Sequence, residues 1–159
     1  MSKPAYTIAP ADLDRPADRI AVVAVLDAYA RDPMGGGAPL APAVAAALPD
    51  RLAAVPQARV WLARDPDGTP VGVAVGFIGF STFAARPLLN LHDLAVLASH
   101  RGRGIGRQLL ATVEQAAREL GCCKITLEVR DDNATAQALY RRVGYGDGAA
   151  SHRFWSKQL

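Results

Sequence analysis

The stretch LLNLHDLAVLASHRGRGIGRQLLATVEQAARELGCCKITLEV, residues 88–129, predicts the central part of the fold. Its two ends, residues 88–96 and 123–129, are short apolar segments typical of strands. Between them, apolar residues recur at a helical spacing, at Ile105, Leu109, Val113, Ala117 and Leu120. Gly121 ends this helix. A strand, a helix and a strand in this order predict a parallel, right-handed crossover.

The flanking sequence supplies further strands and helices, so we expect one α/β domain over residues 1–159. Before the crossover we expect a short strand within 5–12, helices at 20–29 and 41–55, the second interrupted near Pro49, and strands at 58–64 and 69–81. After it we expect a helix at 133–144 and a final strand at 152–159. Hairpins combined with a parallel crossover predict a mixed sheet.

Composition indicates a globular protein of a reducing compartment. Half of the residues are hydrophobic and 21% are charged, which argues against disorder. No apolar run is long enough to span a bilayer, and the N-terminus lacks the apolar core of a signal peptide, so we expect no membrane partner and a cytoplasmic location. Cys122 and Cys123 are adjacent and lack partners at metal-ligand spacing, so we expect no metal. The net charge of only +3 does not favour a nucleic-acid ligand.

The segment RGRGIGR, residues 101–107, has the features of an anion-binding turn that opens a helix. Its glycines, which let the backbone approach a ligand closely, are Gly102, Gly104 and Gly106. Its arginines, which add positive charge, are Arg101, Arg103 and Arg107. A purely structural helix end explains this poorly, because positive charge there opposes the helix dipole. The spacing fits neither a Gly-Lys-Ser/Thr phosphate loop nor a dinucleotide fingerprint.

Two motifs in this order resemble the GNAT N-acetyltransferase superfamily. Arg101, Gly104 and Gly106 match its pyrophosphate-loop pattern Gln/Arg-x-x-Gly-x-Gly/Ala, and LEVRDDNATAQALYRRVGY, residues 127–145, resembles the strand, Asn-led helix and helix-borne Tyr that follow. The resemblance covers about residues 59–146. It implies the GNAT fold, an α/β fold with one mixed, mostly antiparallel sheet whose splayed parallel central strands are flanked by helices.

The resemblance also implies acetyl-CoA as cosubstrate. The pyrophosphate is expected at the turn, on Arg101, Gly102, Arg103, Gly104, Ile105, Gly106 and Arg107. The pantetheine arm is expected along the preceding strand, at Leu94, Ala95 and Val96, where an unpaired N–H near Leu94 can polarise the thioester carbonyl. The remaining cofactor-binding residues are Asn133, Ala136 and Tyr140.

Tyr140 is the expected general acid. The superfamily places a Tyr beside the thioester sulfur, and a phenol with a pKa of about 10 is protonated at neutral pH and can donate to the departing thiolate. The alternative is a core aromatic. Asn133 lies seven residues earlier on the same helix face, and helix capping alone would also explain it.

The general base is left open between His92 and Glu128. Strict alternation places Asn90, His92 and Leu94 on one strand face and Leu91, Asp93 and Ala95 on the other. The strand resembles that of diamine and thialysine acetyltransferases, which carry Glu where this chain has His92, while arylalkylamine acetyltransferases carry histidines on this strand. A neutral imidazole accepts protons, although a structural His is an equal alternative. Asp93 is expected to orient a loop or to pair with an Arg.

We therefore expect an N-acetyltransferase in which the amine of a small molecule or a protein attacks acetyl-CoA directly. Residues 31–40 are expected to form a mobile flap over the acceptor site. One alternative is a non-catalytic acyl-CoA-binding or regulatory protein of the same fold, against which Tyr140 argues. The other is a nucleic-acid-binding module, against which the modest charge and the missing aromatic platform argue. Members of the superfamily commonly form dimers through sheet edges, which suggests a homodimer.

Overall fold

The computed structural model describes residues 6–146, 148 and 153–159. The chain divides into two compact units, Met1–Leu127 and Glu128–Leu159. The single domain expected over residues 1–159 stays a prediction. Within the described residues, no helix combines the length and the apolar character needed to cross a membrane.

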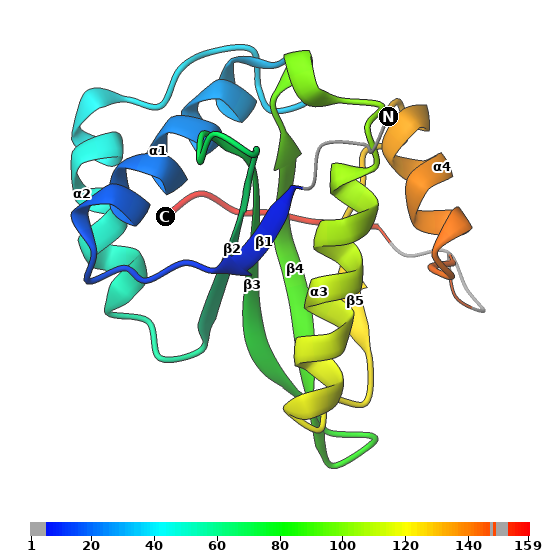
Figure 1. The fold of residues 1–159 in the computed structure, drawn as a ribbon. Coiled ribbons are helices and arrows are strands. Elements are labelled where there is room, and N and C mark those ends of the chain that lie inside the picture. Colours follow the sequence, from blue (N-terminus) through cyan, green and yellow to red (C-terminus); the bar gives the residue numbers. More distant parts are fainter. Residues whose placement is uncertain (1–5, 147, 149–152) are drawn as a thin grey trace. The chain divides into compact units, whose positions relative to one another are not determined.

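The first unit is built on one sheet (Figure 1). Its elements are, in chain order, β1 (Thr7–Pro10), α1 (Pro16–Arg31), α2 (Pro42–Ala53), β2 (Ala58–Arg64), β3 (Pro70–Ser81), β4 (Arg86–Val96), the 3-10 helix η1 (Ala98–His100), α3 (Ile105–Glu119) and β5 (Ile125–Leu127). The strand order is β1-β2-β3-β4-β5. Neighbours from β1 to β4 are antiparallel, and β4 and β5 are parallel. The expected mixed, mostly antiparallel sheet is confirmed, with its parallel pair at one end of this order.

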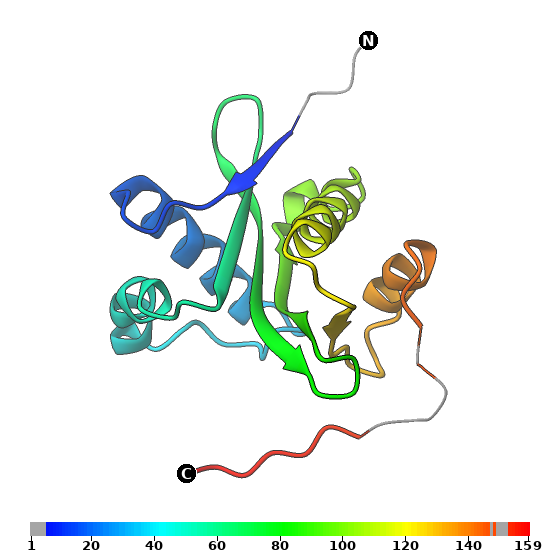
Figure 2. The same cartoon turned by 90° about the horizontal axis from the view of Figure 1, so that it is seen from below.

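Helices cover both faces of this sheet. α1 and α2 lie against one face and α3 against the other (Figure 2). The α1–α2 side holds a hydrophobic cluster whose most buried members are Val22, Val25, Val73 and Val75. On the α3 side, a Cβ at Gly72 would lie 3.2 Å from Cδ1 of Leu109 and 3.1 Å from the backbone oxygen of Ala95. The missing side chain at Gly72 therefore lets α3 pack closely on β3.

The two parallel strands separate along their length. β5 pairs with β4 only where Leu89, Asn90 and Leu91 face Ile125, Thr126 and Leu127. β4 then continues to Val96 beside β3 alone. In the described part of the chain, the edge of β4 from Leu94 to Val96 that faces away from β3 therefore has no strand partner. This is the expected splay.

The start of α1 and the continuity of α2 differ from the sequence prediction. α1 begins at Pro16 rather than Ile20, because the first turn of a helix needs no N–H donor and the fixed φ of proline suits it. α2 runs through Pro49 without interruption. The ring of Pro49 is buried beside Leu52, and this burial offsets the backbone hydrogen bond that proline cannot donate.

The second unit contains α4 (Ala134–Arg142). Residues 153–159 lie in no strand, so the predicted final strand is wrong there, while His152 lies outside the described residues. Phe154 and Trp155 are 81% and 83% exposed. An alternating pattern forms a strand only where a neighbouring strand takes up its backbone hydrogen bonds, and the described residues of this unit offer none.

Candidate functional site

The turn between β4 and α3 has a backbone that requires glycine. Gly102 and Gly104 have φ values of +73° and +85°, in the left-handed region that other residues avoid. Gly104 is the N-cap of α3, and no side chain caps the helix. A Cβ at Gly104 would meet nothing nearer than Nε2 of Gln108 at 4.0 Å. Backbone conformation, not crowding, therefore selects glycine, and the first N–H groups of α3 are left for an anion.

The three arginines of the turn differ in their surroundings. Nε of Arg101 donates to the Val96 oxygen at 3.0 Å, and its Nη2 donates to Oδ2 of Asp32 at 2.8 Å. Arg103 donates to the Ser99 oxygen at 3.0 Å and to the Tyr6 hydroxyl at 3.3 Å. Two of the three guanidinium groups are therefore bound to the protein.

Arg107 lies in the first turn of α3 and its side chain is exposed. Within the described residues it makes no hydrogen bond or ion pair. Its positive charge is therefore available to a ligand at the turn, where the partial positive charge of the helix N-terminus adds to it.

A β-bulge in β4 changes which residues share a face. Val75 pairs with Asp93 and the next residue, Gly76, pairs with Leu91, so His92 is the extra residue. Asp93 thus shares the face of Val75, which belongs to the cluster under α1. The ring of His92 packs edge-on against that of Phe77, with the ring centroids 5.7 Å apart, on that same face.

The predicted alternation is therefore wrong at this point. Asn90, opposite Phe77, joins His92 and Asp93 on the α1–α2 face, whereas Leu94, opposite Ala74, lies on the α3 face. The reason is the bulge, which reverses the alternation for one residue. Three polar side chains gather where strict alternation expected two.

The carboxyl group of Asp93 lies in a poorly solvated position. Burial raises its pKa above the ordinary value, and the adjacent His92 charge works in the opposite direction. Within the described residues it accepts no hydrogen bond and forms no ion pair, so the expected pairing with an Arg is wrong. Asn90, by contrast, donates to the Thr126 hydroxyl at 3.1 Å and so links β4 to β5.

The remaining predicted site residues belong to the second unit. Glu128 is its first residue and is exposed. Oδ1 of Asn133 accepts the N–H of Ala136 at 3.1 Å, so Asn133 caps α4 as its residue type suggests. Tyr140 is half-buried, with its ring 5.8 Å from that of Tyr145.

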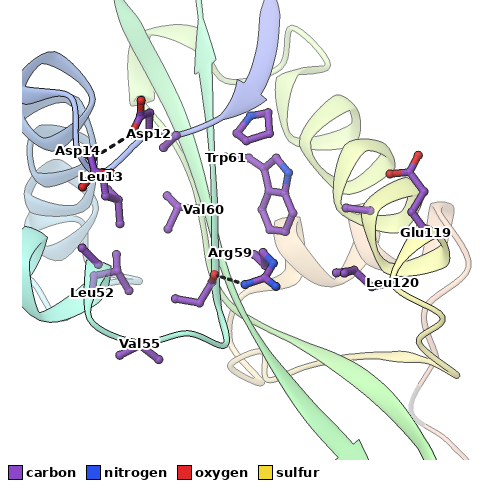
Figure 3. Close-up of a pocket in the computed structure, with 15 residues that line it drawn as sticks. Asp12, Leu13, Asp14, Leu52, Val55, Arg59, Val60, Trp61, Glu119 and Leu120 are labelled. Carbon is purple, nitrogen blue, oxygen red and sulfur yellow. Dashed lines mark hydrogen bonds between the residues drawn. The ribbon is translucent and has the colours of Figure 1, made fainter.

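A pocket of about 490 Å³ lies beside the first residues of β2, in the first unit (Figure 3). Asp12, Asp14 and Glu119 bring carboxylates to it, and Trp61 forms part of its wall. The guanidinium of Arg59 donates to two backbone oxygens beside it. The lining includes none of the predicted site residues, so the pocket supports no part of the expected chemistry.

No group of three or more His, Cys, Asp or Glu side chains is arranged to hold a metal ion in the part of the chain that was described. Burial, and then the neighbouring Cys123, raise the pKa of the Cys122 thiol, which disfavours the nucleophilic thiolate.

One residue of this region had no signal in the sequence. Asp32 ends α1 and contacts Arg101 across 69 positions of the chain. An Asp that precedes a proline resembles any turn residue, and nothing local indicates so distant a partner.

Comparison with known proteins indicates one family. The model of the Acetyltransferase (GNAT) family matches residues 23–145. A streptothricin acetyltransferase of Streptomyces lavendulae is 38% identical over 87 residues, which are 55% of this chain and 44% of that protein. A thialysine N-epsilon-acetyltransferase of Bos taurus is 34% identical over 77 residues, 48% of this chain and 45% of that protein. The chain therefore matches less than half the length of either relative.

A solved structure extends the likeness over the whole chain. The ribosomal-protein-alanine N-acetyltransferase from Brucella melitensis biovar Abortus 2308 matches with a TM-score of 0.74, covering 96% of this chain and 100% of that one. Because the identity is only 20%, this likeness concerns the fold alone.

Proposed function

The chain belongs to the acetyltransferase (GNAT) family, and from this premise we propose that it is an acetyl-CoA-dependent N-acetyltransferase acting on a primary amine. The observation that carries the proposal is the left-handed glycine turn that opens α3, between η1 and the helix. Such a turn presents backbone N–H groups without a side-chain cap, which suits the pyrophosphate of a coenzyme.

Each part of acetyl-CoA has candidate partners. The backbone of residues 101–107 and the exposed guanidinium of Arg107 would hold the pyrophosphate. The pantetheine arm would lie along Leu94, Ala95 and Val96, since this edge of β4 has no strand partner among the described residues. An N–H of this edge near Leu94 would stabilise the oxyanion that forms when the thioester is attacked. The family resemblance assigns Asn133 and Ala136 to the same coenzyme.

The reaction would proceed by direct attack. The ammonium of the acceptor loses a proton to His92 or to Glu128, directly or through water, and the neutral nitrogen attacks the thioester carbonyl. A C–N bond forms and the C–S bond breaks. Tyr140 gives its phenolic proton to the departing thiolate, so that free CoA leaves as the thiol. The attacking nitrogen loses its second proton to water as it becomes an amide, and the Tyr140 phenolate takes a proton back from water. The position of His92 on the face that also holds Asn90 and Asp93 favours it over Glu128 as the base.

The acceptor is proposed only as a class, a primary amine on a small molecule or a protein. The names of the two curated relatives refer to streptothricin and to thialysine. A cytoplasmic location and a homodimer remain predictions from the sequence.

A turnover screen tests this function. The protein is mixed with acetyl-CoA and a panel of primary amines and peptides, and released thiol is followed with a chromogenic disulfide. We expect amine-dependent thiol release that Tyr140→Phe slows strongly. CoA binding without turnover on any amine would instead favour a non-catalytic CoA-binding protein, and salt-dependent nucleic-acid binding that CoA does not compete with would favour the nucleic-acid alternative.

A further inference from the structure

Asp32 organises the segment that follows α1, residues 32–40. Its Oδ1 accepts the N–H of Met34 at 2.9 Å. Its backbone oxygen accepts the N–H groups of Gly35, Gly36 and Gly37 at 2.8, 3.1 and 3.0 Å. Four consecutive amides of this segment therefore bond to one residue.

The far end of the segment is bound back onto α1. The N–H of Ala38 donates to the Ala30 oxygen at 3.1 Å, and that of Leu40 donates to Oδ1 of Asp27 at 2.8 Å. A Cβ at Gly35 would lie 1.9 Å from the backbone oxygen of Tyr29, so the chain passes directly over the end of the helix. The segment expected as a mobile flap is a closely hydrogen-bonded turn.

Arg101 links this segment to the turn of residues 101–107. It is the first residue of the turn. Its Nε donates to the backbone oxygen of Val96 at the end of β4, and its Nη2 donates to Oδ2 of Asp32 at 2.8 Å. The Asp32 side chain is only 17% exposed. The hydrogen bond that the Met34 N–H donates to Asp32, and then the bond from the Arg101 guanidinium, hold the pKa of Asp32 below its ordinary value. The ion pair therefore persists at neutral pH.

We propose that Asp32 is a positioning residue that acts through Arg101, so that a coenzyme bound at residues 101–107 tightens the segment 32–40. An anion held by the N–H groups of residues 101–107 reduces the motion of Arg101. Because Arg101 is paired with Asp32, the motion of Asp32 and of the amides bonded to it is reduced as well. This inference rests on the proposed coenzyme site. It goes beyond that site by giving the Arg101 guanidinium a partner other than phosphate.

Hydrogen exchange of the segment's amides tests the coupling without knowledge of the acceptor. Exchange at residues 34–38 is measured with and without saturating CoA, and CoA affinity is measured by calorimetry for each variant. In the wild type, CoA should slow exchange of these amides about two- to fivefold, the range that a partly exposed ion pair supports.

The matched variants are Asp32→Asn, which keeps an oxygen for the Met34 N–H, and Arg101→Gln. Both should still bind CoA at saturation and should lose its effect on residues 34–38, and the double variant should lose no more than either single one. Glu114→Gln, which removes an exposed ion pair with Arg118 on α3, should keep the full CoA effect.

The outcomes separate the two proposals. CoA binding that leaves exchange at residues 34–38 unchanged or faster, or that slows it equally in Asp32→Asn, overturns the coupling and leaves the coenzyme site standing. The absence of any CoA binding to the wild type overturns both.

Discussion

Replacing Gly104 with Asp or with Asn tests the proposed pyrophosphate site at residues 101–107. The two side chains have nearly the same shape and differ by one charge. Gly104 has φ +85° and ψ 4°, and Asn and Asp are the residues that enter this left-handed region most readily after glycine. A side chain there meets only Nε2 of Gln108, at 4.0 Å from the Cβ position. Both variants should therefore fold, with unfolding temperatures within about 4 °C of each other. The Asp variant alone places a negative charge where the pyrophosphate would bind.

The size of the effect follows from Coulomb's law. At about 6 Å, one carboxylate and one phosphate charge repel by about 0.7 kcal/mol in bulk water and by about 3 kcal/mol at an effective dielectric constant of about 20. These energies correspond to about 3-fold and about 100-fold weaker binding. Since a pyrophosphate carries two nearby charges, we expect Gly104→Asp to bind CoA at least about 10-fold more weakly than Gly104→Asn.

Calorimetric titration with CoA at low and moderate salt measures the difference, and thermal unfolding of both variants checks the fold. The gap between the variants should narrow as salt increases, because salt screens exposed charges. Equal CoA affinity in two folded variants would refute the assignment of residues 101–107 as the pyrophosphate site.

Further substitutions at four positions test the chemistry and the electrostatics. Tyr140→Phe should leave CoA affinity unchanged and lower kcat by about 10²-fold or more; an unchanged kcat with the best amine would make Tyr140 a packing residue. His92→Gln should lower kcat/KM and His92→Glu should partly restore it, whereas a normal kcat/KM in His92→Gln together with a low value in Glu128→Gln would transfer the role of the base to Glu128. Asp93→Asn should raise the unfolding temperature at neutral pH, because the raised pKa of Asp93 means that its charged form destabilises the fold. That gain should shrink as pH falls through the raised pKa towards the ordinary value of 3.8, and a gain that persists at acid pH would contradict the charge explanation.

The crossover and its turn were predictable because their signals are local. Glycines that need positive φ, a helical repeat from Ile105 and strands at both ends all lie within one continuous stretch. The mixed character of the sheet followed from the same hairpin and crossover rules.

The α1–α2 face of β4 was not predictable in the same way. The bulge at His92 inserts only one extra residue into the strand, and no residue type in the sequence indicates its position. It moved Asp93 onto the face of Asn90 and His92, against strict alternation. The Asp32–Arg101 pair joins residues 69 positions apart, and such contacts depend on the packing of the whole unit. Pro49 shows the same limit, because tertiary burial kept α2 intact where local propensity predicted a break.

The central claim, direct acetyl transfer from bound acetyl-CoA to an amine, is tested most directly by mass spectrometry of quenched reactions with and without the best amine. The account predicts that acetylated amine and free CoA appear together in equal amounts, that no CoA is released without amine, and that the protein mass stays unchanged throughout. An acetylated protein intermediate, or no acetylated product on any amine despite measurable CoA binding, would contradict it.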